Sequence, residues 1–199
     1  MTMKKWILQN KKNVFKSPLF SIESLSCRHP EKNVDHDFYV IDMADWINIV
    51  AITDAGRFIM VRQHRLGTNE CTLETPAGLI EANEPPEKAA GRELLEETGY
   101  TASEIILLKK LSVNPAIINN HLYFYLATGC VKSSAQNLDP AEDIEVLDFS
   151  HEEIISMIHS GKINHSIIIT AFSLYFMSPH ANKAAASTLY YGMPPASGH

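Results

Sequence analysis

Glu93, Glu96 and Glu97 lie within one short run of the chain, Arg-Glu-Leu-Leu-Glu-Glu. On a helix these positions stand at i, i+3 and i+4, so their side chains share one face within about 5–6 Å of each other. Like charges at this spacing repel and disfavour a helix that serves only to fold. Hard divalent cations such as Mg²⁺ bind several converging carboxylate oxygens. The pattern therefore indicates either a metal site or a solvated acidic helix face.

The helix that carries these carboxylates has clear sequence signals at both ends. It is expected to begin near residues 84–87, because the prolines there are tolerated in a first helical turn, where the N–H groups have no intrahelical partner. Gly99 is a natural C-terminal stop. Small Ala89 and Ala90 fall on the buried side, which predicts a close approach to a sheet.

Apolar runs before this helix predict the strands of that sheet. Residues 46–52 and 58–61 are separated by an Asp/Gly turn, which is a strong hairpin signal. Their nearly continuous hydrophobicity predicts strands covered on both faces. Residues 71–74 form another predicted strand, and it leads into a sharp Pro/Gly turn at 75–78.

The second half of the chain alternates strands and helices. Residues 105–111, 122–127 and 144–149 have strand patterns, and 151–160 and 166–177 have helix patterns. Strands interleaved with two or three helices predict one α/β domain, with a mixed sheet and helices on both sides.

The first 45 residues differ from this pattern. Short alternating segments at 6–8, 19–25 and 38–41 predict a small antiparallel sheet, too small to be a domain by itself. We therefore predict an N-terminal β appendage at 1–45, a main domain at 46–177 and a weakly ordered C-terminal tail at 178–199. The appendage must bury its apolar face on the main domain or on a second subunit.

Composition narrows the class of protein. The 199 residues suffice for one domain with an appendage, and the formal charge of −6 argues against a general nucleic-acid-binding surface. Cys27, Cys71 and Cys130 are odd in number and far apart, which favours free thiols in a reducing compartment. No segment has the pattern of a signal peptide or a membrane span, so we expect a cytoplasmic protein without membrane partners.

Residues 78–100 fit the pattern G-x5-E-x7-R-E-U-x-E-E-x-G-U, where U is a bulky apolar residue. This stretch resembles the signature box of the Nudix hydrolases, with Tyr100 where an aliphatic residue is more usual. Residues 74–81 resemble the E-x-P-A-G-x-I-E segment of ADP-ribose pyrophosphatases and other nucleoside diphosphate sugar hydrolases. Pro115, sixteen residues past Gly99, and the run at 62–65 are similar to features of the same subgroup. The resemblance implies the Nudix α/β/α sandwich.

The resemblance also implies hydrolysis of a diphosphate linked to a second moiety, with Mg²⁺, or alternatively Mn²⁺, as cofactor. Glu97, Glu96 and a loop carboxylate are then the expected catalytic residues. The loop carboxylate is Glu142, as ligand or general base, with Glu145 and Asp139 as alternatives. The full set of expected metal ligands is Glu93, Glu96, Glu97, Glu142 and the carbonyl of Ala77.

Substrate contacts and structural roles follow from the same resemblance. Arg65 is expected to clamp the terminal phosphate, although an ordinary surface arginine is the alternative. Trp6 resembles a base-stacking aromatic, with a core tryptophan as the alternative. The other substrate-binding candidate is Glu74, and the residues with expected structural roles in the motif are Gly78, Glu84, Arg92 and Gly99.

The favoured substrate is ADP-ribose, which would give AMP and ribose 5-phosphate. GDP-mannose, another ADP-sugar or a dinucleotide would keep the chemistry and change the second moiety. A catalytically inactive nucleotide sensor is the alternative of another class, although such domains typically lose box glutamates. We also expect a homodimer, in which each appendage contributes to the neighbouring cleft.

Overall fold

The computed structural model describes residues 3–181, which divide into two compact units. The first unit comprises the chain up to Trp46 together with Leu111–Leu122, and the second comprises Ile47–Lys110 and the chain from Tyr123 onward. The strands up to the first helix are β1 (Ile7–Lys16), β2 (Phe20–Arg28), β3 (Asp35–Met43), β4 (Trp46–Thr53), β5 (Phe58–Arg65), β6 (Glu70–Glu74) and β7 (Ala77–Leu79). The remaining elements are α1 (Pro86–Thr98), β8 (Tyr100–Thr101), β9 (Glu104–Ser112), β10 (His121–Lys132), β11 (Glu145–Phe149), α2 (His151–His159) and α3 (Ser166–Phe176).

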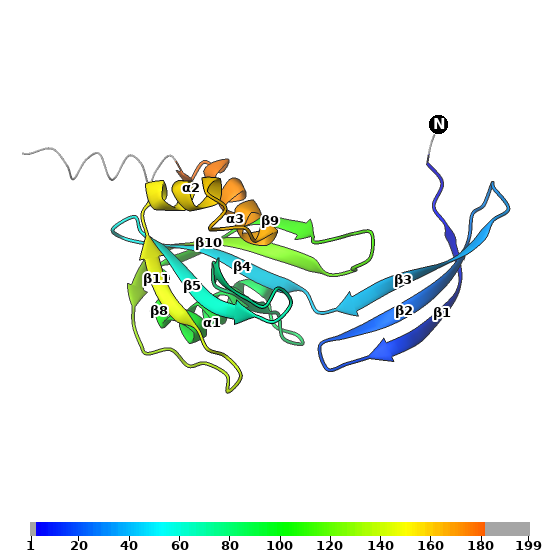
Figure 1. Cartoon of the computed structure of the whole chain (residues 1–199), viewed down its shortest axis with the longest axis horizontal. Helices are drawn as coiled ribbons and strands as arrows, with labels where there is room; N and C mark the ends of the chain where they lie inside the picture. Colours follow the sequence, from blue (N-terminus) through cyan, green and yellow to red (C-terminus); the bar gives the residue numbers. More distant parts are fainter. Residues whose placement is uncertain (1–2, 182–199) are drawn as a thin grey trace, which may run out of the picture. The chain divides into compact units, whose positions relative to one another are not determined.

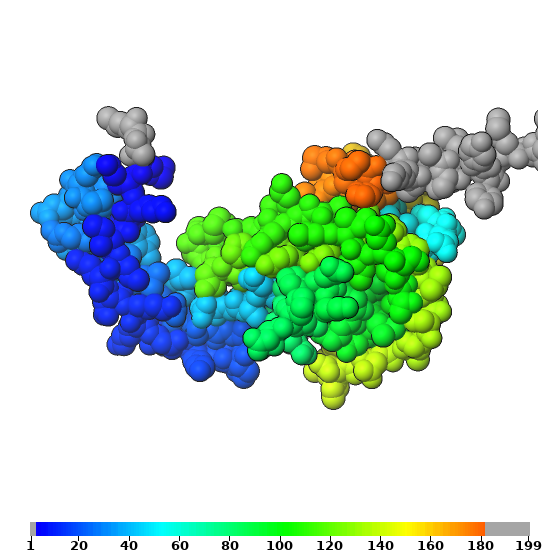
Figure 2. All heavy atoms as spheres, turned by 180° about the vertical axis from the view of Figure 1, so that it is seen from behind, coloured from blue at the N-terminus to red at the C-terminus, as the bar shows by residue number. Residues whose placement is uncertain are grey.

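The first unit contains the small antiparallel sheet predicted from the sequence, in the order β1-β2-β3. Every residue of β1 is exposed. Its atoms are among those drawn in dark blue in Figure 2. Among the three strands only Cys27 is buried. This sheet therefore lacks a hydrophobic core of its own.

The turn between β9 and β10 belongs to the same unit as this sheet. Ile41 donates a backbone hydrogen bond to the carbonyl of Ile117 at 2.8 Å, and its own carbonyl accepts one from Asn119 at 3.2 Å. The side chain of Asn120 donates to the carbonyl of Ala44 at 3.1 Å. These bonds attach the turn to β3 and to the residue that follows it.

The second unit is built on a mixed sheet with the order β11-β5-β4-β10-β8. Outside this path, β6 pairs with β5, β7 with β4 and β9 with β10. Figure 1 shows α1 on one side of the sheet and α2 and α3 on the other. The predicted α/β class and Nudix-type layering are confirmed.

The two faces of the sheet are packed in different ways. On the α1 side, Ala89, Ala90 and Leu94 lie in one buried cluster with Ile47 and Ile49 of β4. Small side chains on the helix let it approach the strands closely, as the sequence predicted. On the other side the aromatic rings of α3 cover the sheet. Their closest ring contacts with β5 join Phe58 to Phe172 and Tyr175, each at 5.4 Å between centroids.

The predicted tail at 178–199 lies outside the described residues from position 182 onward. Within residues 3–181, no helix is long and apolar enough to cross a membrane. The domain boundaries predicted at 45/46 and 177/178 stay a prediction.

Candidate functional site

Helix α1 begins and ends where its sequence signals lie. Pro85 has an extended backbone and precedes the first helical residue, Pro86. Gly99 adopts the left-handed conformation with φ of 71°, and its N–H donates to the carbonyl of Leu95 at 2.7 Å. A Cβ on Gly99 would lie 2.3 Å from the carbonyl oxygen of Ser134. A residue with a side chain would therefore both strain this turn and push away the segment beside it.

Glu97 is the most buried carboxylate of the helix, with 4% of its surface exposed. Its Oε2 accepts a hydrogen bond from the backbone N–H of Ala77 at 3.0 Å. Burial raises the pKa of Glu97 to about 8, and repulsion from Glu93 and Glu142 adds to this rise. The 75–78 turn thus contacts α1 at Glu97, the carboxylate of this helix whose pKa is raised most.

Glu93 lies against the same turn. A Cβ added to Gly78 would stand 2.1 Å from the carboxyl carbon of Glu93, so any larger residue at 78 would displace this carboxylate. The pKa of Glu93 is raised to about 6, chiefly by burial. Arg92 opposes this rise, and the charges of Glu96 and Glu142 contribute to it. Gly78 is therefore required for close approach and not for an unusual backbone angle.

Arg92 joins the two ends of the acidic stretch. Its Nε and Nη2 donate to the two oxygens of Glu84 at 2.9 and 2.8 Å, which is the fork expected from the sequence. Its Nη1 also donates to Glu93 at 2.8 Å and to Glu96 at 3.0 Å. These two carboxylates, at i+1 and i+4 from Arg92, therefore lie within reach of its guanidinium. Purely structural roles for Arg92 and Glu84 stay a prediction.

The segment after β10 is attached to the C-terminal end of α1. Gln136 donates from Nε2 to the carbonyls of Glu97 at 2.6 Å and Ile144 at 3.0 Å. Asn137 N donates to the carbonyl of Glu96 at 2.9 Å. The last carbonyls of a helix have no intrahelical donor, and this segment supplies donors for them. In Figure 2 its yellow-green atoms border the green atoms of the α1 region.

This attachment brings the loop that carries Glu142 to the C-terminal end of α1. Glu142 is exposed, and its Oε2 accepts a hydrogen bond from the N–H of Asp139 at 2.9 Å. Its negative charge contributes to the raised pKa of both Glu93 and Glu97. The alternative Glu145, on β11, instead forms an ion pair with Arg62.

The sequence model of the NUDIX domain matches residues 45–172 of this chain. The chain belongs to the NUDIX family. It is 31% identical over 132 residues to an ADP-ribose pyrophosphatase of Bacillus subtilis (strain 168), covering 66% of this chain and 70% of that protein. It is 30% identical over 126 residues to a methanol dehydrogenase activator of Bacillus methanolicus, covering 63% of this chain and 68% of that protein.

Further comparisons agree with this assignment. A GDP-mannose pyrophosphatase of Enterobacter sp. (strain 638) is 32% identical over 113 residues, which cover 53% of this chain and 59% of that protein. The crystal structure of an ADP compounds hydrolase superposes with a TM-score of 0.78 at 24% identity, covering 88% of this chain and 94% of that chain. The structural match shows the fold, and the predicted Nudix hydrolase family is confirmed.

Arg65 of this Nudix protein is held by a buried acid. Its Nε and Nη2 donate to Glu74 Oε1 and Oε2 at 2.8 and 2.7 Å, and Thr72 donates to the same carboxylate at 2.5 Å. Burial alone would raise the pKa of Glu74, but the hydrogen bonds from Arg65 and Thr72 outweigh it and lower that pKa. The hydrogen bond to Glu74 raises the pKa of Arg65, and the negative charges of Glu97 and Glu142 contribute in the same direction.

Glu74 itself has 2% of its surface exposed, and both its oxygens already accept hydrogen bonds. Direct contact between Glu74 and a substrate stays a prediction, and its observed contacts are those of a residue that positions Arg65. Thr72 was not identified from the sequence. Strand alternation could have found it, because positions i and i+2 of a strand share a face.

Trp6 lies in the N-terminal unit and directly precedes the first residue of β1. Its ring stands edge-on to His29 and Phe38, with centroids 5.1 and 5.0 Å away. It keeps 39% of its surface exposed, so the interpretation as a core residue is wrong. Base stacking by Trp6 stays a prediction.

Whether this chain can hold a divalent cation depends on its donor set. Among the side chains of residues 3–181, no three His, Cys, Asp or Glu groups are placed as a ready-made metal site. The donors on α1 are nevertheless hard oxygen ligands of the type that Mg²⁺ prefers. The raised pKa values of Glu93 and Glu97 mark two carboxylates that a nearby cation would stabilise. The residues therefore fit the metal, provided that Glu93 and Glu96 exchange their contacts with Arg92 for it.

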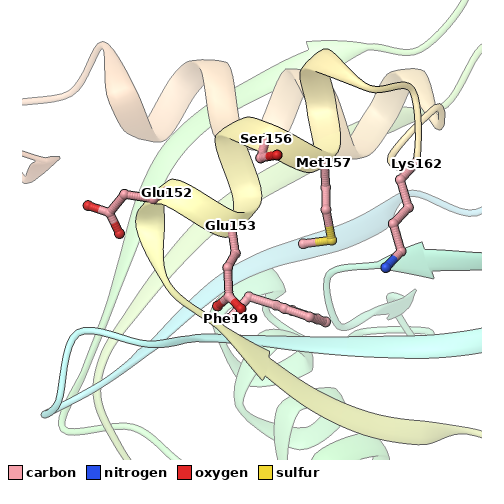
Figure 3. Close-up of a pocket in the computed structure, with 6 residues that line it drawn as sticks. All are labelled: Phe149, Glu152, Glu153, Ser156, Met157 and Lys162. Atoms are coloured by element: carbon pink, nitrogen blue, oxygen red, sulfur yellow. The ribbon is translucent and has the colours of Figure 1, made fainter.

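A hollow of about 400 Å³ lies elsewhere in this unit, between β11, α2 and the segment that connects α2 to α3 (Figure 3). Its lining residues are Phe149, Glu152, Glu153, Ser156, Met157 and Lys162. None of them belongs to the predicted site, and α2 covers the face of the sheet opposite α1. This hollow is therefore separate from the acidic site.

Proposed function

We propose that this chain is a Mg²⁺-dependent hydrolase of nucleoside diphosphate sugars, which converts ADP-ribose into AMP and ribose 5-phosphate. The observation that carries the proposal is the pair of carboxylates at the 75–78 turn, buried Glu97 and partly buried Glu93, with Glu142 on the loop attached to the C-terminal end of the same helix. Relatives named ADP-ribose pyrophosphatase and GDP-mannose pyrophosphatase, at 31% and 32% identity, support a diphosphate substrate with an attached sugar.

Each side chain has a distinct part in the proposed reaction. Glu93 and Glu97 hold the divalent metal, with Glu96 and the Ala77 carbonyl as further ligands. Bound Mg²⁺ would neutralise the diphosphate and make water more acidic. Glu142, on the loop attached to the C-terminal end of α1, is the candidate that removes the proton from the attacking water.

The diphosphate also needs a positive group outside the metal face. Arg65 is the candidate for this group, because Glu74 holds two of its nitrogens in a bidentate arrangement. A planar guanidinium with remaining N–H donors suits a phosphate oxygen. We assign Arg65 to the phosphate furthest from the nucleoside.

Two alternatives to the proposed function can be distinguished by comparing substrates. GDP-mannose, another ADP-sugar or a dinucleotide would use the same catalytic groups with a different second moiety. An inactive nucleotide sensor would not need the metal-binding carboxylates of the 78–100 motif. This chain has all three of them, Glu93, Glu96 and Glu97. We therefore favour the enzyme.

We further propose a cytoplasmic homodimer whose N-terminal sheet, residues 1–45, packs on a second subunit beside the 46–177 domain. The sheet and its β1–β2 turn expose apolar side chains, including Leu8 at 53%, Phe15 at 49% and Leu19 at 65%. Exposed apolar residues grouped in this way mark an interaction surface. Light scattering at micromolar concentration should give twice the mass of one chain, and a monomer would contradict the proposal.

A substrate panel tests the proposed function. ADP-ribose, GDP-mannose, other nucleoside diphosphate sugars, dinucleotides and nucleoside triphosphates are compared with Mg²⁺ or Mn²⁺ present, and the products identify the bond that breaks. We expect the highest kcat/KM for ADP-ribose. Activity confined to triphosphates would reject the proposal, and binding of nucleotides without turnover would favour the sensor.

A further inference from the structure

Strand β4 carries one polar side chain within a buried apolar run. Asn48 has 2% of its surface exposed, and its neighbours Ile47 and Ile49 have none. Burying an amide costs free energy unless the amide finds hydrogen-bond partners, so an asparagine here needs a specific reason.

The partner of Asn48 lies in the turn that leads to the metal face. Thr75, with 1% of its surface exposed, donates from Oγ1 to Asn48 Oδ1 at 2.8 Å. The next residue of β4, Ile49, donates its N–H to the carbonyl of Pro76 at 2.9 Å. Two consecutive residues of β4 therefore hold two consecutive residues of the turn.

The same turn continues directly to the acidic helix. Ala77 follows Pro76, and its N–H donates to Glu97 Oε2 at 3.0 Å. Pro76 has no N–H to donate, and the hydroxyl of Thr75 is a side-chain donor that joins this part of the turn to β4. A continuous path of contacts joins Asn48 on the central strand to the carboxylate of Glu97 on α1.

We infer that Asn48 is a positioning residue, which acts through Thr75 to set the place of the Ala77 backbone against Glu97. Asn48 and Thr75 stand outside the 78–100 box, and their pairing joins positions 27 residues apart. The consequence for metal binding rests on the proposed function. The consequence for the Ala77 hydrogen bond does not.

The first test replaces Thr75 by valine, which keeps the shape of the side chain and removes its hydroxyl. In metal-free protein we expect the Ala77 amide hydrogen to exchange faster, as measured by NMR. Calorimetry should show Mn²⁺ affinity lowered by about tenfold or more, the usual effect of losing a partner of a metal ligand. Thr75→Ser, which keeps the hydroxyl, should restore both values.

A matched control is available on the same strand. Thr53, at the far end of β4, accepts a hydrogen bond from the N–H of Arg57 at 3.1 Å and has no contact with the turn. Thr53→Val should leave Ala77 exchange and Mn²⁺ affinity unchanged. Equal Ala77 exchange in Thr75→Val and Thr53→Val would overturn the inference.

A double variant separates positioning from simple stabilisation of the core. Asn48→Leu with Thr75→Val removes both polar partners, so thermal stability should recover compared with Thr75→Val alone. Ala77 exchange should remain fast, because nothing holds the side chain at position 75. Recovery of stability and exchange together would mean that the pair only stabilises the core. If wild-type protein neither binds Mn²⁺ nor hydrolyses any substrate, the proposed function fails, and the exchange data still decide the inference.

Discussion

The backbone N–H of Ala77 lies 3.0 Å from Oε2 of Glu97 and donates a hydrogen bond to it, across 20 residues of sequence. This bond joins the turn after β6 to the acidic face of α1. Glu97 is almost fully buried, so one backbone donor leaves its charge poorly stabilised. The site is thus organised around a carboxylate whose negative charge a bound cation would stabilise.

Replacing Glu97 by glutamine should lower turnover by about two orders of magnitude or more, because it removes a charged metal ligand. The fold should remain intact, since the amide has the same size and can still accept from Ala77. Steady-state kinetics and circular dichroism measure the two effects. Glu87→Gln is the control, because Glu87 is an exposed residue in the first turn of the same helix. Equal activity of both variants would contradict the ligand assignment.

The metal-free protein should lose stability as pH rises. Burial raises the pKa of Glu93 to about 6 and that of Glu97 to about 8, both from an ordinary value of 4.5. Between pH 4.5 and 8 the folded state therefore binds more protons than the unfolded state, so the free energy of unfolding falls as pH increases.

The measurement for this pH dependence is the Tm in EDTA from pH 5 to 8.5. Glu97→Gln should remove the part of the decline near pH 8, so its Tm there should exceed that of wild type by several degrees, at about 2–4 °C per kcal/mol for a chain of this size. Parallel declines of the two proteins would argue that Glu97 is not the group responsible.

Gly78→Ala should weaken metal binding, because the new Cβ would occupy the place of the Glu93 carboxylate at 2.1 Å. We expect a loss of Mn²⁺ affinity of about tenfold or more, as measured by calorimetry. Gly67 is the matched control, since a Cβ there would meet nothing within 4 Å. If the two variants bind Mn²⁺ equally well, the close approach at Gly78 has no bearing on the metal.

Arg65→Ala should raise KM for the substrate by about tenfold, the usual effect of removing a charge-assisted bond to phosphate, with a smaller change in kcat. Glu74→Gln should act in the same direction by loosening the guanidinium, and the double variant should be no worse than Arg65→Ala alone. Additive effects would instead indicate an independent contact between Glu74 and the substrate. Arg57→Ala, which breaks an exposed pair with Asp148, should leave KM unchanged.

The sequence predicted the elements with strong local signals. The limits of α1 follow from Pro85 and Gly99, and the β4–β5 hairpin follows from its Asp/Gly turn. The α2 helix begins at a capping box in which Ser150 and Glu153 bond reciprocally. In each case neighbouring residues contain the information that fixes the backbone.

Features that depend on long-range contacts were not found in the sequence. Gln136 donates a hydrogen bond to the carbonyl of Glu97, 39 residues away in sequence, and no local pattern predicts that bond. Two-residue β8 is too short to leave a hydrophobic period. Spatial proximity, and not spacing along the chain, decides these interactions.

The most direct test of the proposed activity is product analysis with ADP-ribose. Wild-type protein with Mg²⁺ should release AMP and ribose 5-phosphate in equal amounts, and the reaction should stop when EDTA is added and resume with excess Mg²⁺. Glu97→Gln should form these products at least about a hundredfold more slowly. Formation of AMP at the same rate in EDTA, or by Glu97→Gln, would contradict a metal-dependent reaction at the acidic face of α1.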